Sequence, residues 1–73
     1  RVFFTSIMKL HLNGAVAEFE GVLTIAGLLS RHQLKPESVV VEYNYKVPPK
    51  SDYSSIELKD GDTVEIVKFM GGG

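Results

Sequence analysis

The last three residues, Gly71-Gly72-Gly73, form the segment of this sequence that most clearly suggests a chemical reaction. Glycine has no Cβ, so such a segment fits a narrow, extended channel that would reject any side chain. It would deliver the α-carboxylate of Gly73 to a partner's active site. Attack of this carboxylate on the α-phosphate of ATP would give an acyl-adenylate, from which a sulfur nucleophile makes a thiocarboxylate and an amine makes an amide. Taken alone, three glycines also fit a frayed chain end or the remnant of an expression linker.

The rest of the sequence offers no competing set of catalytic residues. His11 and His32 are far apart and lack a third ligand at metal-binding spacing. Asp60-Gly61-Asp62 has the composition of a turn and lacks the further acidic residues of a calcium loop. There is no cysteine, which excludes disulfides, thiolate zinc sites and cysteine nucleophiles. We therefore expect the chain to be acted on by enzymes and not to be one.

Composition points to one small globular domain. The chain has 73 residues, of which 44% are hydrophobic and 23% are charged. Its net charge is −1 with acids and bases interspersed, which gives no electrostatic footprint for nucleic acid or anionic lipid. No apolar run reaches the length of about 20 residues that a membrane-spanning helix needs. We expect neither nucleic acid nor a membrane among its partners.

Hydrophobic periodicity predicts four strands and one helix. Alternation of apolar and polar residues begins at Met8, and Asn13-Gly14 favours a tight hairpin turn. Thr24 is a candidate cap for a helix that should end near Gln33, because Pro36 disfavours helical geometry before it. The expected elements are strands at 8–12 and 15–19, the helix, a strand at 39–43, an irregular segment at 51–58 and a strand at 63–69.

This order of elements is typical of an α+β domain with one helix packed on one face of a mixed sheet. Placing the first and last strands side by side and parallel in the centre gives the β-grasp topology, with four to five strands. We assign residues 8–70 to the β-grasp domain and residues 71–73 to a flexible glycine tail. Residues 1–7 are interpreted as an added or upstream extension, because the pattern is complete without them; a native extension of the first strand is the alternative.

A candidate docking surface lies on the sheet face opposite the helix. Val40 and Val67 are expected to point outward there, and Phe69 follows Val67 by two residues and so shares its side. An apolar centre with a charged rim is typical of protein-binding surfaces, although single exposed apolar residues are common on any protein. The position beside the tail favours docking. The surface comprises Val40, Glu42, Val67, Phe69 and Met70, and Lys9, His11 and Glu65 are expected around it.

Five segments carry a resemblance to a known family: Leu10–Gly14, Thr24–Leu29, Val39–Asn44, Val47–Lys50 and Asp60–Val67. With the glycine tail, they make residues 8–73 resemble ThiS, the family of sulfur carriers of thiamine biosynthesis, within the ubiquitin-like superfamily. The family usually has Glu or Asp where Gly27 stands, and Gly where Tyr45 stands. It more often has one proline followed by Arg where this chain has Pro48-Pro49-Lys50. None of these departures touches the tail chemistry.

The resemblance implies a ubiquitin-like β-grasp fold and the role of a protein co-substrate. A ThiF-type adenylyltransferase would activate the tail at Gly72-Gly73, using ATP and magnesium. A cysteine desulfurase or another donor would supply sulfur for the thiocarboxylate, and ThiG, the thiazole synthase, would build that sulfur into the thiazole ring. We expect no cofactor bound to the carrier itself, a cytoplasmic location and a monomer when the chain is free.

Three alternatives share the same tail chemistry or the same fold. The chain could carry sulfur for molybdopterin, like the related MoaD carriers, or for another sulfur-containing metabolite. It could be a ubiquitin-like modifier that forms isopeptide bonds to lysines. It could also be a β-grasp interaction domain whose glycines are incidental. The sequence alone does not separate the thiamine pathway from the other sulfur pathways.

Overall fold

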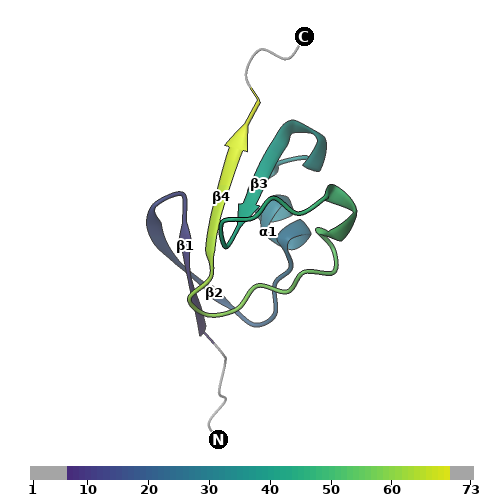
Figure 1. Ribbon diagram of the computed structural model, residues 1–73. Coiled ribbons are helices and arrows are strands. Elements are labelled where there is room, and N and C mark those ends of the chain that lie inside the picture. Colours follow the sequence, from purple (N-terminus) through teal and green to yellow (C-terminus); the bar gives the residue numbers. More distant parts are fainter. Residues whose placement is uncertain (1–6, 70–73) are drawn as a thin grey trace, which may run out of the picture.

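The computed structural model describes residues 7–69; residues 1–6 and 70–73 lie outside the described part. Within that part the chain forms a four-stranded sheet, one α-helix and two short 3-10 helices (Figure 1). In chain order these are β1 (Ile7–Leu12), β2 (Ala15–Glu20), α1 (Ile25–Arg31), η1 (Pro36–Ser38), β3 (Val39–Tyr43), η2 (Lys50–Asp52) and β4 (Thr63–Lys68).

The strand order across the sheet is β2-β1-β4-β3. β1 and β4 are parallel central neighbours, while β2 and β3 are antiparallel edge strands. The prediction of a β-grasp topology is therefore confirmed, with four strands in the described part of the chain. β1 begins at Ile7, one residue before the predicted start, because Ile7 pairs with Glu20 of β2.

Two turns, the predicted one after β1 and another after β3, use backbone that favours Asn or Gly. Asn13 and Gly14 have φ angles of 50° and 83°, as a tight primed turn requires, and they join β1 to β2. Asn44 and Tyr45 have φ angles of 50° and 69° and turn the chain out of β3. A tyrosine in the left-handed region is strained, whereas the family's usual glycine would not be.

The helix forms as its sequence predicts. The Thr24 hydroxyl accepts a hydrogen bond from the Gly27 N–H at 3.0 Å, which caps the first turn. A Cβ at position 27 would lie 3.0 Å from Leu23 Cδ1, so the space for a side chain is tight there. The helix ends at Arg31, two residues earlier than predicted, because Gln33 adopts a φ of 58°. Its apolar stripe of Ile25, Leu28 and Leu29 is fully buried.

The core lies between the sheet and α1 and is closed at one end by the segment after β3. Tyr53 and Leu58 are buried there, and Ile56 is half-buried against the same cluster. All three side chains come from the segment at 51–58 that was expected to be irregular, so this segment contributes directly to the core. The remaining core residues are Met8, Leu10, Leu23, Ile25, Leu28, Leu29, Val39, Val41 and Val64.

Candidate functional site

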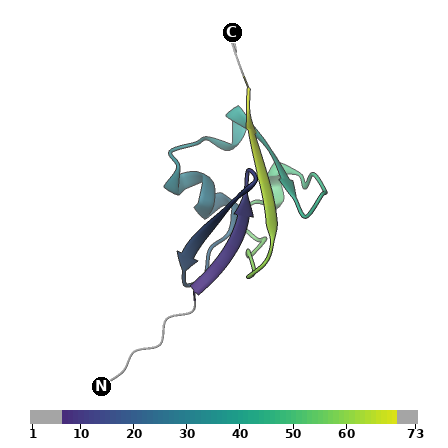
Figure 2. The ribbon, with the colours of Figure 1, turned by 90° about the vertical axis from the view of Figure 1, so that its left-hand side faces the viewer.

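Among the described residues, β4 starts between two strands and ends beside only one. Its parallel pairing with β1 stops at Leu12 and Val64, after which β1 turns away at Asn13. Pairing with β3 continues to the last residue of β4, where Lys68 lies opposite Val39. Phe69 then donates its N–H to the Ser38 carbonyl at 2.9 Å. In Figure 2, β4 runs well past the tip of β1 toward the C-terminal side of the molecule.

The face of β4 opposite the helix carries the predicted apolar surface. Val67 is 59% exposed and Phe69 is 52% exposed, whereas Val64 on the alternate face is buried. Val40 of β3 lies directly opposite Val67 and is half-buried. The structure thus brings Val40, Val67 and Phe69 together at the end of the sheet from which the chain continues toward the tail.

The rim of this surface differs from the prediction on one side. Glu42 and Glu65 lie opposite each other on β3 and β4, two residues from the Val40–Val67 pair, as expected. His11, however, lies beside Thr63, and the carbonyl of Lys9 accepts the Gly61 N–H at 2.7 Å. Since a strand rises about 3.3 Å per residue, His11 is roughly 13 Å along β4 from Val67. The placement of Lys9 and His11 around Val67 was therefore wrong, and the described rim is acidic.

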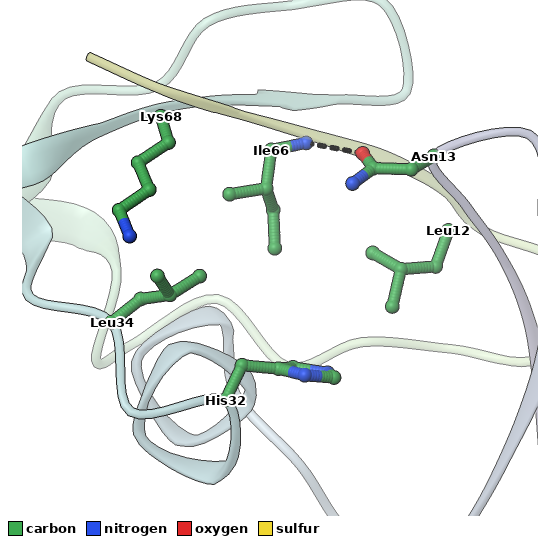
Figure 3. A pocket seen from close by; sticks show the side chains of 6 residues that line it. All are labelled: Leu12, Asn13, His32, Leu34, Ile66 and Lys68. Carbon is green, nitrogen blue, oxygen red and sulfur yellow. Dashed lines mark hydrogen bonds between the residues drawn. The ribbon is translucent and has the colours of Figure 1, made fainter. Parts of the chain in front are cut away.

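A groove opens on the opposite side of β4, toward the helix, and the sequence did not reveal it. We call it the edge groove; it encloses about 220 Å³ (Figure 3). Asn13 marks its outer wall, where the side-chain Oδ1 accepts the Ile66 N–H at 2.7 Å. The sequence identifies Asn13 only as a turn residue, because a hydrogen bond to Ile66, 53 positions away, leaves no local signal in the sequence. The lining residues are Leu12, Asn13, His32, Leu34, Ile66 and Lys68.

The beginning of β4 is fixed by a cluster of hydrogen bonds around Asp62. The carboxylate accepts from the Tyr43 hydroxyl at 2.7 Å, from the Asn44 amide at 3.1 Å and from the Lys59 N–H at 2.7 Å. The Asn44 Oδ1 in turn accepts the Thr63 N–H at 2.8 Å. This cluster ties the turn after β3 to the turn before β4.

Titration of the cluster follows from these contacts. Burial, followed by the hydrogen bond and charge of Asp62, raises the pKa of Tyr43 to about 12. For Asp62, burial works to raise the pKa. The hydrogen bonds from Tyr43, Asn44 and the Lys59 backbone, with the charge of Lys59, outweigh burial and hold the pKa below its ordinary value. Asp62 is therefore anionic and Tyr43 neutral at pH 7, so the cluster is structural and carries no poised acid or base.

Four predicted site residues, Met70, Gly71, Gly72 and Gly73, lie outside the described residues. Their roles stay predictions. Between residues 7 and 69 no group of three His, Asp or Glu side chains is placed to hold a metal ion. Over the same range no helix is long and apolar enough to cross a membrane.

Comparison with known proteins decides the family. A model of the ThiS family matches residues 10–73, which includes both the strand that leads to the tail and the glycines themselves. The chain belongs to the ThiS family. The resemblance and the ubiquitin-like β-grasp fold inferred from the sequence are thereby confirmed.

Individual relatives agree with this assignment. The chain is 42% identical over 65 residues to the sulfur carrier protein ThiS of Bacillus subtilis, covering 88% of this chain and 98% of that protein. The crystal structure of the thiamine biosynthesis protein ThiS from Geobacter metallireducens superimposes with a TM-score of 0.76. That protein is 38% identical, and the match covers 90% of this chain and all of the other.

Two other relatives are much longer proteins. Thiazole synthases of Paramagnetospirillum magneticum and Magnetococcus marinus are each 41% identical to the chain over 66 residues. The match covers 90% of this ThiS family member but only 20% of either synthase. The chain therefore spans about a fifth of the length of these two relatives.

Proposed function

We propose that this ThiS family member is a sulfur carrier of thiamine biosynthesis and that the Gly73 carboxylate is its working group. The observation that carries the proposal is the family match through Gly73, since it includes the segment on which the chemistry depends. The fold supports it, because central strand β4 ends at Lys68, three residues before the first glycine of the tail. Residues without side chains can enter a narrow channel, so a domain docked near the end of β4 can present the Gly73 carboxylate inside it.

The chemistry proceeds in two steps on partner enzymes. A ThiF-type adenylyltransferase binds ATP and magnesium, and a carboxylate oxygen of Gly73 attacks the α-phosphate and releases pyrophosphate. A sulfur nucleophile then attacks the acyl carbon and displaces AMP, which leaves a thiocarboxylate. In the cell the sulfur comes from a cysteine desulfurase or another donor. The carrier contributes the acyl group and holds no cofactor of its own, so it is a co-substrate and not an enzyme.

The acceptor is a thiazole synthase of the ThiG kind. Two thiazole synthases contain a segment 41% identical to this chain, which suggests that carrier and synthase are covalently joined in those proteins. Proteins that work in succession gain from such linkage, because it raises their effective concentration. This match favours thiazole synthesis over molybdopterin synthesis and over lysine modification. We place the reaction in the cytoplasm.

Intact mass tests the proposal directly. The chain is incubated with a ThiF-type enzyme, ATP, magnesium and sodium sulfide, and we expect one sulfur-for-oxygen exchange located at Gly73 by fragmentation. Omitting ATP is the control that must abolish the exchange. An unchanged mass with an enzyme that does convert a different ThiS protein would contradict the carrier proposal. Conjugates on other proteins would favour the modifier alternative.

The pathway needs a second assay. The thiocarboxylate form is added to a thiazole synthase with its remaining substrates, and thiazole formation is measured together with return of the chain to its original mass. The same form is added to a molybdopterin synthase large subunit as the comparison. Turnover by the latter alone would assign the chain to the molybdopterin pathway.

A further inference from the structure

The edge of β4 that faces away from β3 loses its partner strand at Ile66. In the β3–β4 ladder, Val40 with Val67 and Ser38 with Phe69 are the pairs whose backbone groups face each other. Because backbone groups alternate along a strand, those of Ile66 and Lys68 point to the opposite side. The Ile66 N–H is satisfied by the Asn13 side chain. Among the described residues, no backbone partner is found for the Ile66 carbonyl or for the N–H and carbonyl of Lys68.

Within residues 7–69, three backbone groups therefore lie open in a row where β1 would continue if it did not turn. A β-strand with such an edge is a template for pairing with another extended segment. Asn13 already occupies the first position of that missing strand and imitates a backbone acceptor (Figure 3). The open stretch is only two to three residues long, so it accepts a short segment and does not propagate into a larger sheet.

The edge groove lies where the inward side chain of an added strand would fall. Successive side chains of a strand point to opposite faces, so a segment beside Ile66 and Lys68 would place one side chain toward α1. The groove there has apolar walls from Leu12, Leu34 and Ile66. The next side chain would point to the outer face, beside Val67 and Phe69. An added strand would thus join the groove and the apolar surface into one interface.

Charge defines which segment fits. Lys68 and His32 line the groove, and none of its six lining residues is acidic. Arg31 and Lys35 are exposed on the neighbouring segment. A lysine at an open edge opposes pairing with apolar or basic strands and favours a partner strand that carries Asp or Glu.

We propose that the enzyme that receives the tail adds a short extended segment to the β4 edge at Ile66 and Lys68. This segment has an apolar side chain for the edge groove and an acidic side chain opposite Lys68. Pairing at this position aligns β4 with the entrance of the partner's channel, because the tail begins three residues beyond Lys68. The inference rests on the proposed function and specifies how its partner holds the chain.

Amide hydrogen exchange tests the pairing on the unaltered protein. The ¹⁵N-labelled chain is measured free and then saturated with a recombinant thiazole synthase, and separately with a ThiF-type enzyme. We expect the Lys68 N–H to exchange rapidly in the free chain and at least about tenfold more slowly in one of the complexes. The Val67 N–H, which is paired with β3 in both states, is the adjacent control. Unchanged Lys68 exchange in both saturated complexes overturns the proposal.

A pair of variants isolates the backbone contribution. Lys68→Ala keeps the N–H and removes the charge, whereas Lys68→Pro removes both, and the missing N–H is one that β3 does not use. We expect Lys68→Pro to bind the enzyme roughly fivefold to tenfold more weakly than Lys68→Ala, with similar melting temperatures. Equal affinity overturns the strand pairing. If Lys68→Pro fails to fold, the exchange measurement on the unaltered chain decides.

Further results distinguish the contribution of the Lys68 charge, the strand pairing and the proposed function from one another. Lys68→Glu should weaken binding more than Lys68→Ala does. Equal affinity of these two variants would overturn the proposal that the partner places an acidic side chain opposite Lys68. A chain that binds both enzymes without protection of Lys68 in either complex contradicts only the strand pairing. A chain that gains no thiocarboxylate in the mass assay contradicts the proposed function, whatever its Lys68 exchange shows.

Discussion

The two ends of β4 are built in opposite ways. At its start, β4 is paired on both sides, and the carboxylate of Asp62 just before it accepts three hydrogen bonds. At its end it is paired only with β3, and Val67, Lys68 and Phe69 are exposed. One end is saturated with internal contacts, and the other leaves its side chains exposed. Under the proposed function, this difference separates fold stability from partner binding along a single strand.

Deletion of Gly72 and Gly73 tests the separation at its extreme. We expect complete loss of thiocarboxylate formation, because the acyl group moves away from the partner's catalytic centre. The free energy of unfolding should change by less than about 0.5 kcal/mol, as for surface changes in general. Intact mass and thermal unfolding measure the two effects. An unfolded truncation would show that the tail and the domain are not separable.

The buried start of β4 should respond strongly to loss of volume. Val64 is fully buried, so Val64→Ala removes two buried carbon atoms and leaves a cavity, which costs about 2 kcal/mol of unfolding free energy. Val67→Ala, three residues along the same strand, should change it by less than about 0.5 kcal/mol. Urea unfolding of both variants provides the measurement. Equal losses would mean that the two ends of β4 are not different.

A substitution at the exposed end of β4 should change the affinity for the partner enzymes. Val67→Asp is expected to weaken binding to the thiazole synthase or the adenylyltransferase roughly tenfold, because it places a charge in an apolar contact. Its melting temperature should hardly change. Val16→Asp is a matched control, since Val16 is 62% exposed on the same sheet face but lies on edge strand β2. Equal weakening by both variants would contradict a localised docking surface.

Removing the Tyr43 hydroxyl should destabilise the start of β4, where Asp62 accepts its hydrogen bond. Tyr43→Phe breaks the hydrogen bond to Asp62 and is expected to cost about 1 kcal/mol of unfolding free energy in this partly exposed place. Comparison of the tyrosinate absorbance of the two proteins should show one group titrating at about pH 12. Because this folded pKa lies above the ordinary value of 10.0, its stabilisation is complete below pH 10 and is lost as the pH rises toward 12. A midpoint near 10 would rule out the contact.

Acid should weaken the same cluster by a smaller amount. The folded pKa of Asp62 lies below the ordinary value of 3.8, so its contribution is present above that pH and is lost as the pH falls through the folded pKa. The melting temperature of the wild-type chain minus that of Asp62→Asn should therefore shrink below pH 4 and stay constant from pH 5 to 8. A difference that does not depend on pH would show that the charge of Asp62 plays no part.

Local patterns in the sequence predicted most of the scaffold. Asn13-Gly14, Thr24 and the alternation that begins at Met8 each specify geometry through neighbours a few residues away, so the turn, the helix cap and the faces of β1 were confirmed. The position of His11 relative to Val67 was wrong, because the register of two parallel strands is set by contacts some fifty residues apart. The edge groove was missed for the same reason, since it combines β1, the helix end and β4.

The parallel pairing of β1 and β4 also determines how the domain carries mechanical load. If a partner draws the tail into its channel, force acts along β4, at right angles to its hydrogen bonds with β3 and at a slant to those with β1. Hydrogen bonds that lie across the direction of the force are loaded together in shear and do not break one after another. Pairing with β3 along the whole of β4 and with β1 at its start shares the strain between two strands. The carrier can therefore be pulled by its tail without its sheet being peeled apart.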